Sequence, residues 1–185
     1  MYYHASPLGG LRILKPRVSN HGVPLVYFSN KRENVLVYLS NAVERFCREA
    51  GFVHDGSWYK WASYGFQKDG RQCIEEYYPD ALRETYEGVS GYIYRAETVP
   101  QAEMQLRIPD AVASSEAVQV VDCEFVRDAY AEILTAEAQG LLTVQRFAQM
   151  TQPQRRWLER TLQTEYKNAE NHPDYRYFLR KKFGI

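Results

Sequence analysis

The chain has 185 residues and a mass of 21.6 kDa, which fits one domain, or one domain with a helical appendage, and excludes two full catalytic domains. Hydrophobic residues make up 45% and charged residues 25%, so a buried core is expected and wholesale disorder is excluded. The 23 basic and 23 acidic side chains cancel, which leaves no global positive field to attract nucleic acid or an anionic membrane.

The sequence shows no signal for a membrane or for an oxidising compartment. No run approaches the roughly 20 apolar residues that a membrane span requires, and the opening MYYHASPLGG lacks the charged-then-apolar order of a signal peptide. The three cysteines are far apart and odd in number, which indicates packed thiols rather than disulfides or a zinc motif. The histidines at 21, 54 and 172 lack partners at metal-ligand spacing. We expect a cytoplasmic protein with no metal site and no membrane partner.

The first predicted elements are a strand, a second strand and a long helix. Residues 1–4 form a short strand that a proline and two glycines end. The run Leu25–Ser29 is β-branched and aromatic, as in a buried strand, and its last residue can cap the helix that follows. From Arg32 to Ala50 apolar residues recur at spacings of three and four, which predicts one helix with a single buried face. The apolar residues of that face are Val35, Leu36, Leu39, Val43, Phe46 and Cys47.

The middle of the chain is rich in aromatic residues and glycines. Residues 52–79 have a composition suited to a short hairpin and an irregular aromatic segment. One or two helical turns follow over Pro79–Tyr86, and Val89–Ala96 has the pattern of a strand. Residues 100–109 form a connection, with or without a short strand at residues 104–108.

The last third of the chain is predicted to be mainly helical. Residues 117–121 give one more strand, and the apolar spacing of Phe125–Leu134 predicts a helix that ends by Gly140. Two closing helices are expected within Leu141–Lys182, one of them begun by a cap-and-proline signal at residues 151–153.

This order of strands and helices predicts the α+β class. We expect an α+β domain over residues 1–140 and a helical extension over residues 141–185 that packs on it.

The opening of the chain resembles the ADP-ribosyltransferase superfamily, and within it the His-Tyr-Glu branch that includes diphtheria-type toxins and poly(ADP-ribose) polymerases. The resemblance rests on Tyr3-His4-Ala5-Ser6, on Leu25–Ser29 and on the helix that carries Tyr38. It covers about forty residues, and short patterns of this kind have moderate specificity. It implies a split antiparallel β-sheet with flanking helices, NAD as the substrate, and transfer of ADP-ribose to a protein, nucleic acid or small molecule, or hydrolysis of NAD.

The resemblance also implies roles for individual residues. His4, with Ser6 beside it, would bind the ribose and amide side of NAD, since an imidazole can hydrogen-bond a ribose hydroxyl. Tyr27 or Tyr38 would stack on the nicotinamide, because a tyrosine face holds a flat ring at modest entropic cost.

The family's catalytic glutamate has several candidates in this chain. Glu116 stands in Ser114-Ser115-Glu116-Ala117-Val118 at the mouth of a predicted strand and best matches the family's glutamate-then-strand segment. Its carboxylate would stabilise the positive charge that develops on the ribose as nicotinamide leaves. Glu97, Glu75 and Glu76 are the alternatives. The arginine branch of the superfamily needs Arg, Ser-Thr-Ser and Glu-X-Glu segments, which do not occur here in order.

Each of these residues also has a structural interpretation, and together these give a second hypothesis. His4 can be a hydrogen-bonded strand-end histidine, the tyrosines can be packing residues, and Glu116 can be a solvated cap. The chain would then be a non-catalytic binding module that uses its aromatic middle and a weak basic patch to hold a partner. That patch consists of Arg180, Lys181 and Lys182.

Overall fold

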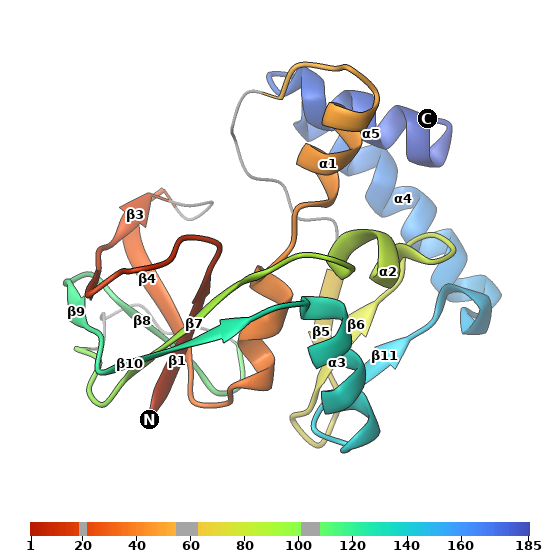
Figure 1. Cartoon of the computed structure of the whole chain (residues 1–185). Helices are drawn as coiled ribbons and strands as arrows, with labels where there is room; N and C mark the ends of the chain where they lie inside the picture. Colours follow the sequence, from red (N-terminus) through yellow and green to blue (C-terminus); the bar gives the residue numbers. More distant parts are fainter. Residues whose placement is uncertain (19–21, 55–62, 101–107) are drawn as a thin grey trace.

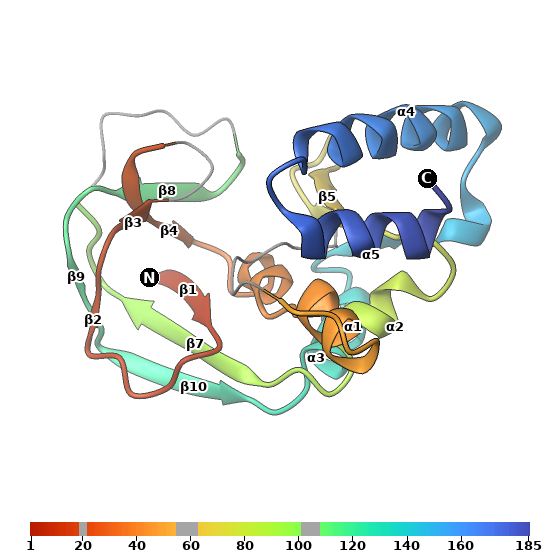
Figure 2. The same ribbon diagram turned by 90° about the horizontal axis from the view of Figure 1, so that it is seen from above.

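The chain is an α+β protein whose strands and helices are largely segregated. The computed structural model describes residues 1–18, 22–54, 63–100 and 108–185. Figure 1 shows the main sheet on one side of the molecule and the α-helices on the other, and Figure 2 shows the same arrangement from above.

The main sheet has the strand order β10-β7-β1-β4-β3, with β8 also paired to β4, and all these pairs are antiparallel. Its strands are β1 (Tyr2–Ser6), β3 (Arg17–Val18), β4 (Pro24–Ser29), β7 (Gly91–Ala96), β8 (Ala111–Ser114) and β10 (Asp122–Val126). A two-stranded ladder of β2 (Ile13–Leu14) and β9 (Val118–Gln119) lies beside it.

The two central strands β1 and β4 separate along their length. β1 runs in register with β7 from Tyr2 to Ser6, whereas its only registered pair with β4 is Tyr3 with Ser29. The sheet is therefore split between β1 and β4 beyond Tyr3, and the backbone groups that face this split need partners other than a strand ladder.

The split sheet is covered differently on its two faces. One face, which includes Ala5 and Ile93, packs on the 3₁₀-helix η1 (Glu33–Tyr38), on α2 (Ala81–Tyr86) and on α3 (Ala129–Ala138). The other face, which includes Phe28 and Tyr94, packs against residues of β2 and β9. Alternation of side chains along a strand produces these two faces, and each has its own apolar cluster.

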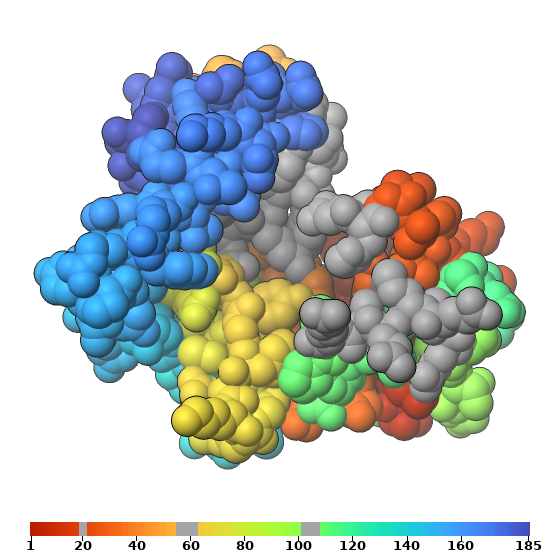
Figure 3. All heavy atoms as spheres, turned by 180° about the vertical axis from the view of Figure 1, so that it is seen from behind, coloured from red at the N-terminus to blue at the C-terminus, as the bar shows by residue number. Residues whose placement is uncertain are grey.

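A second lobe is built around helices from both ends of the chain. α1 (Ala42–Glu49), α4 (Gln152–Asn168) and α5 (Pro173–Phe183) share one apolar cluster with Tyr77 and Tyr78. A three-stranded sheet lies below them, in which β6 (Gln72–Glu75) pairs with β5 (Ser63–Phe66) and, in parallel, with β11 (Thr143–Gln145). A short 3₁₀-helix, η2 (Phe147–Gln149), leads into α4. Figure 3 shows the C-terminal helices above the yellow segment of β5 and β6.

The structure confirms most of the predicted elements and changes two of them. The helix predicted over Arg32–Ala50 is divided into η1 and α1, because the chain leaves helical geometry at Leu39, whose ψ is 69°. The helix predicted from Phe125 begins later, at Ala129, where the Asp128 carboxylate accepts hydrogen bonds from two backbone N–H groups. Phe125 belongs instead to β10. The short strand considered at residues 104–108 lies almost wholly outside the described residues.

Candidate functional site

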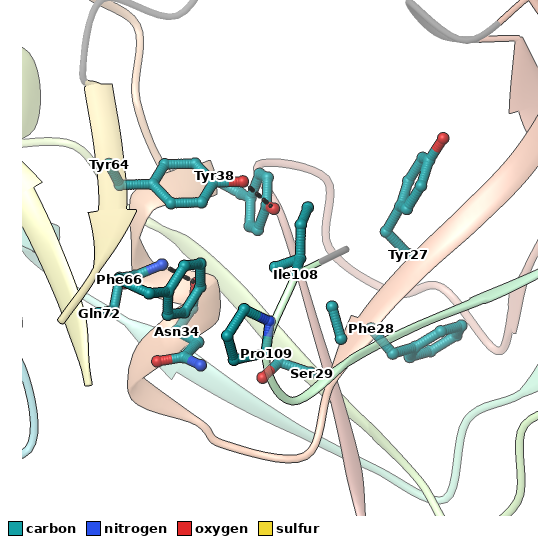
Figure 4. Close-up of a pocket in the computed structure, with 11 residues that line it drawn as sticks. Tyr27, Phe28, Ser29, Asn34, Tyr38, Tyr64, Phe66, Gln72, Ile108 and Pro109 are labelled. Carbon is teal, nitrogen blue, oxygen red and sulfur yellow. Dashed lines mark hydrogen bonds between the residues drawn. The ribbon is translucent and has the colours of Figure 1, made fainter. Parts of the chain in front are cut away.

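A pocket lies where the two lobes meet, and aromatic side chains form much of its wall (Figure 4). Tyr27 comes from β4, Tyr38 from η1 and Tyr64 from β5, so three separate elements bring these rings together. On the face drawn in Figure 3 the yellow segment of β5 and β6 lies beside the green segment that follows Ile108. The cavity measures about 30 Å³, which is room for about two waters. The remaining lining residues are Phe28, Ser29, Asn34, Phe66, Gln72, Ile108, Pro109 and Ala111.

The phenol groups of Tyr38 and Tyr64 meet inside this pocket. Their hydroxyl oxygens are 2.7 Å apart, and their rings make an edge-to-face contact with centroids 6.1 Å apart. Burial, followed by the influence of Tyr64, raises the pKa of Tyr38 far above its usual range, so this hydroxyl stays neutral. The pair is therefore a fixed aromatic wall that also carries polar groups.

His4 bonds to the main chain of Tyr27 across the split between β1 and β4. Its Nδ1 lies 2.8 Å from the Tyr27 carbonyl oxygen, which can only accept, so Nδ1 carries the proton. Burial lowers the pKa of His4 from 6.5, and the hydrogen bond opposes this only in part, which makes the ring neutral at pH 7. The other ring nitrogen, Nε2, then holds a lone pair that can accept a hydrogen bond from a hydroxyl.

The imidazole of His4 and the phenol of Tyr27 lie on opposite faces of the sheet. The His4 ring contacts Phe28, with centroids 5.7 Å apart. Tyr27 and Phe28 extend to opposite sides of β4 (Figure 4). Tyr27 thus shares a face with Tyr38, whereas His4 bonds to the backbone carbonyl of Tyr27 from the other face.

The other predicted site residues lie further from the pocket. Ser6 is buried at the end of β1, and its hydroxyl accepts a hydrogen bond from the Leu8 N–H at 3.2 Å. Glu116 is exposed beyond the end of β8, where its N–H donates to the Ser114 hydroxyl at 3.1 Å. The pocket lining includes Ala111, at the opposite end of β8 from Ser114, and Tyr27, which pairs with Ala113 next to Ser114.

The alternative glutamates are also absent from the described pocket lining. Glu97 is exposed just after β7. Glu75 accepts a hydrogen bond from the Ser63 hydroxyl at 2.9 Å. Glu76 is buried, and its carboxylate accepts from two backbone N–H groups at 3.1 Å, which ties the end of β6 to α2 and η2. Glu76 therefore stabilises the fold at that corner.

An ion pair that the sequence did not single out lies next to the pocket. Asp110 stands between the lining residues Pro109 and Ala111 and pairs with Lys31 at 2.8 Å. It adopts φ of 60°, a conformation that is rare for a residue with a side chain. Its backbone carbonyl also accepts from the Asn30 N–H at 2.9 Å. Asp110 and Glu33, which directly precedes Asn34, are the two carboxylates adjacent in sequence to described lining residues.

Two buried carboxamides at the pocket were also missed by sequence analysis. Asn34 is 5% exposed and Gln72 is 1% exposed, and both line the cavity. Asn34 directly precedes the apolar run Val35–Val37, all of which is buried in η1. A polar side chain adjoining such a run is the signal that could have marked this position.

The expected basic patch is only partly a free surface. Arg180 and Lys181 are exposed at the end of α5. Lys182 instead pairs with Glu84 and packs over the rings of Phe46 and Tyr78 at 5.1 and 5.0 Å. The Lys182 ammonium group is therefore paired with a carboxylate and also contacts two aromatic rings.

Searches for other kinds of site and for relatives gave no assignment. No helix in the described parts of the chain is long and apolar enough to cross a membrane. Within the same residues no cluster of three or more His, Cys, Asp or Glu side chains is arranged to hold a metal ion. The chain matches no protein-family model, no curated protein and no solved structure.

Proposed function

We propose that the chain binds NAD beside Tyr27 and Tyr38 and catalyses transfer of its ADP-ribose to an acceptor, or to water. One observation carries the proposal. The two tyrosines that the resemblance singles out for stacking on nicotinamide come from different elements, yet they line the same pocket. Stacking between tyrosine faces and a flat ring is a common way to hold such a ligand.

The proposed reaction breaks the bond between the ribose anomeric carbon and the nicotinamide nitrogen. The bonding electrons leave with nicotinamide, a lone pair of the acceptor or of water forms the new bond to that carbon, and the proton that the acceptor or water then loses passes to solvent. His4 would accept a hydrogen bond from a ribose hydroxyl through Nε2, because Nδ1 is occupied by the Tyr27 carbonyl. Since the His4 ring and the Tyr27 phenol lie on opposite faces of the sheet, the ribose would have to reach His4 through the split between β1 and β4. A carboxylate near the ribose would stabilise the developing positive charge.

Nicotinamide requires a wider pocket than the structure has. A cavity of about 30 Å³ holds water but no aromatic ring. Figure 4 shows Ile108 between Tyr38 and Tyr27. We propose that displacement of this side chain admits a ring between the two tyrosines.

Calorimetric titration with NAD and a nicotinamide-release assay test the proposal. We expect wild type to bind NAD with micromolar Kd and Tyr38→Ala to bind at least about tenfold more weakly, because it loses the stacking surface. His4→Ala should weaken binding by a similar factor. Tyr166→Ala, which removes a partly buried tyrosine of α4 outside the pocket lining, is the matched control and should bind as wild type does. Absence of wild-type binding at millimolar NAD would overturn the proposal.

A scan of single carboxylates then identifies the catalytic group. The variants are Asp110→Asn, Glu116→Gln, Glu97→Gln, Glu75→Gln and Glu76→Gln, and Glu103→Gln is added from the sequence between Pro100 and Ile108, outside the described residues. The variant that loses the catalytic carboxylate should release nicotinamide at least about a hundredfold more slowly while binding NAD normally. Equal turnover in all of them would show that no carboxylate of this set acts in catalysis.

A second function is favoured by the composition of the pocket. No Asp or Glu stands among its described lining residues. A non-catalytic module that binds a flat ligand needs aromatic walls but no carboxylate. Tight NAD binding in wild type without nicotinamide release, with or without acceptor proteins, would support this module over the transferase.

A further inference from the structure

The carboxamides of Asn34 and Gln72 carry hydrogen-bonding atoms that the rest of the described chain does not satisfy. Neither Nδ2 nor Oδ1 of Asn34 has a partner among the described residues, and Oε1 of Gln72 has none either. Gln72 Nε2 donates to the Asn34 carbonyl oxygen at 3.2 Å. Buried polar groups without partners are rare because each has lost its hydrogen bonds to water without a replacement.

These atoms lie at one end of the pocket in fixed positions. Asn34 is held in the buried η1, and Gln72 is held in β6 by its pairing with Phe66. Figure 4 shows the two side chains together, next to Phe66. Because Gln72 Nε2 faces a carbonyl, the orientation of its amide is set, and Oε1 is the atom left to accept.

The unsatisfied atoms form a specific pattern of one donor group and two acceptors. Asn34 Nδ2 offers hydrogens, whereas Asn34 Oδ1 and Gln72 Oε1 offer lone pairs. A primary carboxamide is the complement of this pattern, since its oxygen accepts and its two N–H groups donate. A carboxylate would bring only acceptors against the two oxygens, and such a mismatch is strongly selective.

We propose that Asn34 and Gln72 form a carboxamide-recognition site, which selects ligands whose flat ring carries a primary amide and rejects the matching carboxylic acid. The identification of that ring as nicotinamide rests on the proposed function. The selection for an amide rests on the two side chains alone.

The test measures binding of free nicotinamide and free nicotinate by titration calorimetry to wild type and variants. Wild type should bind nicotinamide at least about tenfold more tightly than nicotinate, and Asn34→Asp should bind nicotinamide at least about tenfold more weakly than wild type, because it removes the donor for the oxygen of the ligand's amide, while nicotinate stays excluded. Asn34→Leu should lose nicotinamide binding and melt at a higher temperature, because it removes the unsatisfied polar atoms at little change in size. Asn168→Asp, which changes an exposed amide at the end of α4, is the control and should keep the wild-type preference.

The outcomes separate this inference from the proposed function. If wild type binds NAD and releases nicotinamide but binds nicotinate as well as nicotinamide, the carboxamide site is wrong and the transferase proposal stands. If wild type does not bind NAD yet prefers nicotinamide to nicotinate, and Asn34→Asp weakens nicotinamide binding, the carboxamide site stands alone. Unchanged nicotinamide binding in a folded Asn34→Leu protein also overturns the inference, and would assign the unsatisfied atoms to buried water.

Discussion

His4 shows how one hydrogen bond serves both the fold and the candidate site. The strands β1 and β4 share a single registered pair, so the Tyr27 carbonyl would lack a strand partner at the split. Nδ1 of His4 supplies that partner, because it lies 2.8 Å from the Tyr27 carbonyl oxygen. The same bond fixes which ring nitrogen can accept from a ligand, and the structural and functional interpretations of His4 are therefore compatible.

The neutral state of His4 predicts a pH dependence of stability. Its pKa is lowered from 6.5 in the folded chain, so the unfolded chain binds more protons as pH falls below about 6.5. The wild-type free energy of unfolding should therefore decrease from pH 7.5 to 5.5. His4→Asn keeps a donor for the Tyr27 carbonyl but does not titrate, and should show a smaller decrease in urea unfolding over this range. Equal decreases in both proteins would contradict the prediction.

The sequence predicted the aromatic part of the site better than its polar part. Tyr27 and Tyr38 were chosen through a family-like order of residues, and both line the pocket. Gln72 and Asn34 are 38 positions apart and only the packing of η1 on β6 brings them together, so local pattern could not pair them. Glu116 matches a local pattern, but it is exposed after the end of β8 and is not among the described lining residues of the pocket.

Among the elements, η1 and α1 show why the spacing of apolar residues predicted one helix where the structure has two. Leu36 and Leu39 are buried in the cluster beneath the main sheet, whereas Val43 and Cys47 are buried in the cluster under α5. Their spacing of three and four suits one helix, but the residues serve two different cores and the chain turns between them. Leu39 also packs closely on Gly91, because a Cβ atom added to Gly91 would lie only 2.5 Å from Cδ2 of Leu39. Such contacts arise from tertiary structure and cannot be predicted from the spacing of apolar residues along the sequence.

The sequence pattern does not predict β10, for a related reason. It lies at one end of the sheet's strand order, and most of its side chains are exposed or half-buried, so the alternation that marks a half-buried strand is weak. The next element, α3, has a clear sequence signal for where it begins. Asp128 stands directly before the helix and caps it, with Oδ1 accepting from the Tyr130 N–H at 2.9 Å.

Arg32 joins three of these elements. Arg32 directly precedes η1. Its guanidinium donates to the Glu124 carboxylate of β10 at 3.0 Å and to the Glu132 carboxylate of α3 at 2.9 Å. The ion pair with Arg32 lowers the pKa of Glu124, so the attraction is fully present at neutral pH and is lost as acid protonates this carboxylate.

Replacement of Arg32 should loosen the junction between η1, β10 and α3. We expect Arg32→Met to lower the free energy of unfolding by about 1–2 kcal/mol, a range reduced by the partial exposure of both glutamates. Chemical denaturation at pH 7 measures the change. Arg71→Met, which breaks an exposed pair with nearby Asp69, is the matched control and should cost under about 0.5 kcal/mol. Equal losses in the two variants would show that the Arg32 bridge contributes no more than a surface pair.

At the scale of the molecule, the C-terminal helices are part of the structural core. The boundary predicted at residue 140 falls between α3 and β11, and β11 pairs with β6 from the middle of the chain. α5 and α1 share an apolar cluster in which Phe178 and Val43 are 1% and 0% exposed. Removal of the last 45 residues, 141–185, would expose that face of α1.

We therefore predict that residues 1–140 alone do not fold cooperatively. The fragment should bind a hydrophobic dye and show poor amide dispersion in NMR spectra, because the apolar face of α1 has no cover. Phe178→Ala in the full chain is the milder comparison and should cost about 3–5 kcal/mol while keeping the native spectrum. A fragment with sharp, dispersed amide signals would show that the helical extension is dispensable.

The narrowness of the pocket has a consequence for how tightly any ring-shaped ligand can bind. In the view of Figure 4 the side chain of Ile108 lies between Tyr38 and Tyr27. On the proposal above, a ring binds there only in molecules in which Ile108 has moved. If about one molecule in a hundred is open at a given moment, the apparent Kd is about a hundredfold weaker than the Kd of the open form. Ile108→Ala would then increase affinity by raising the open population, without adding a contact to the ligand. Affinity in this protein would be set as much by that equilibrium as by the residues that touch the ring.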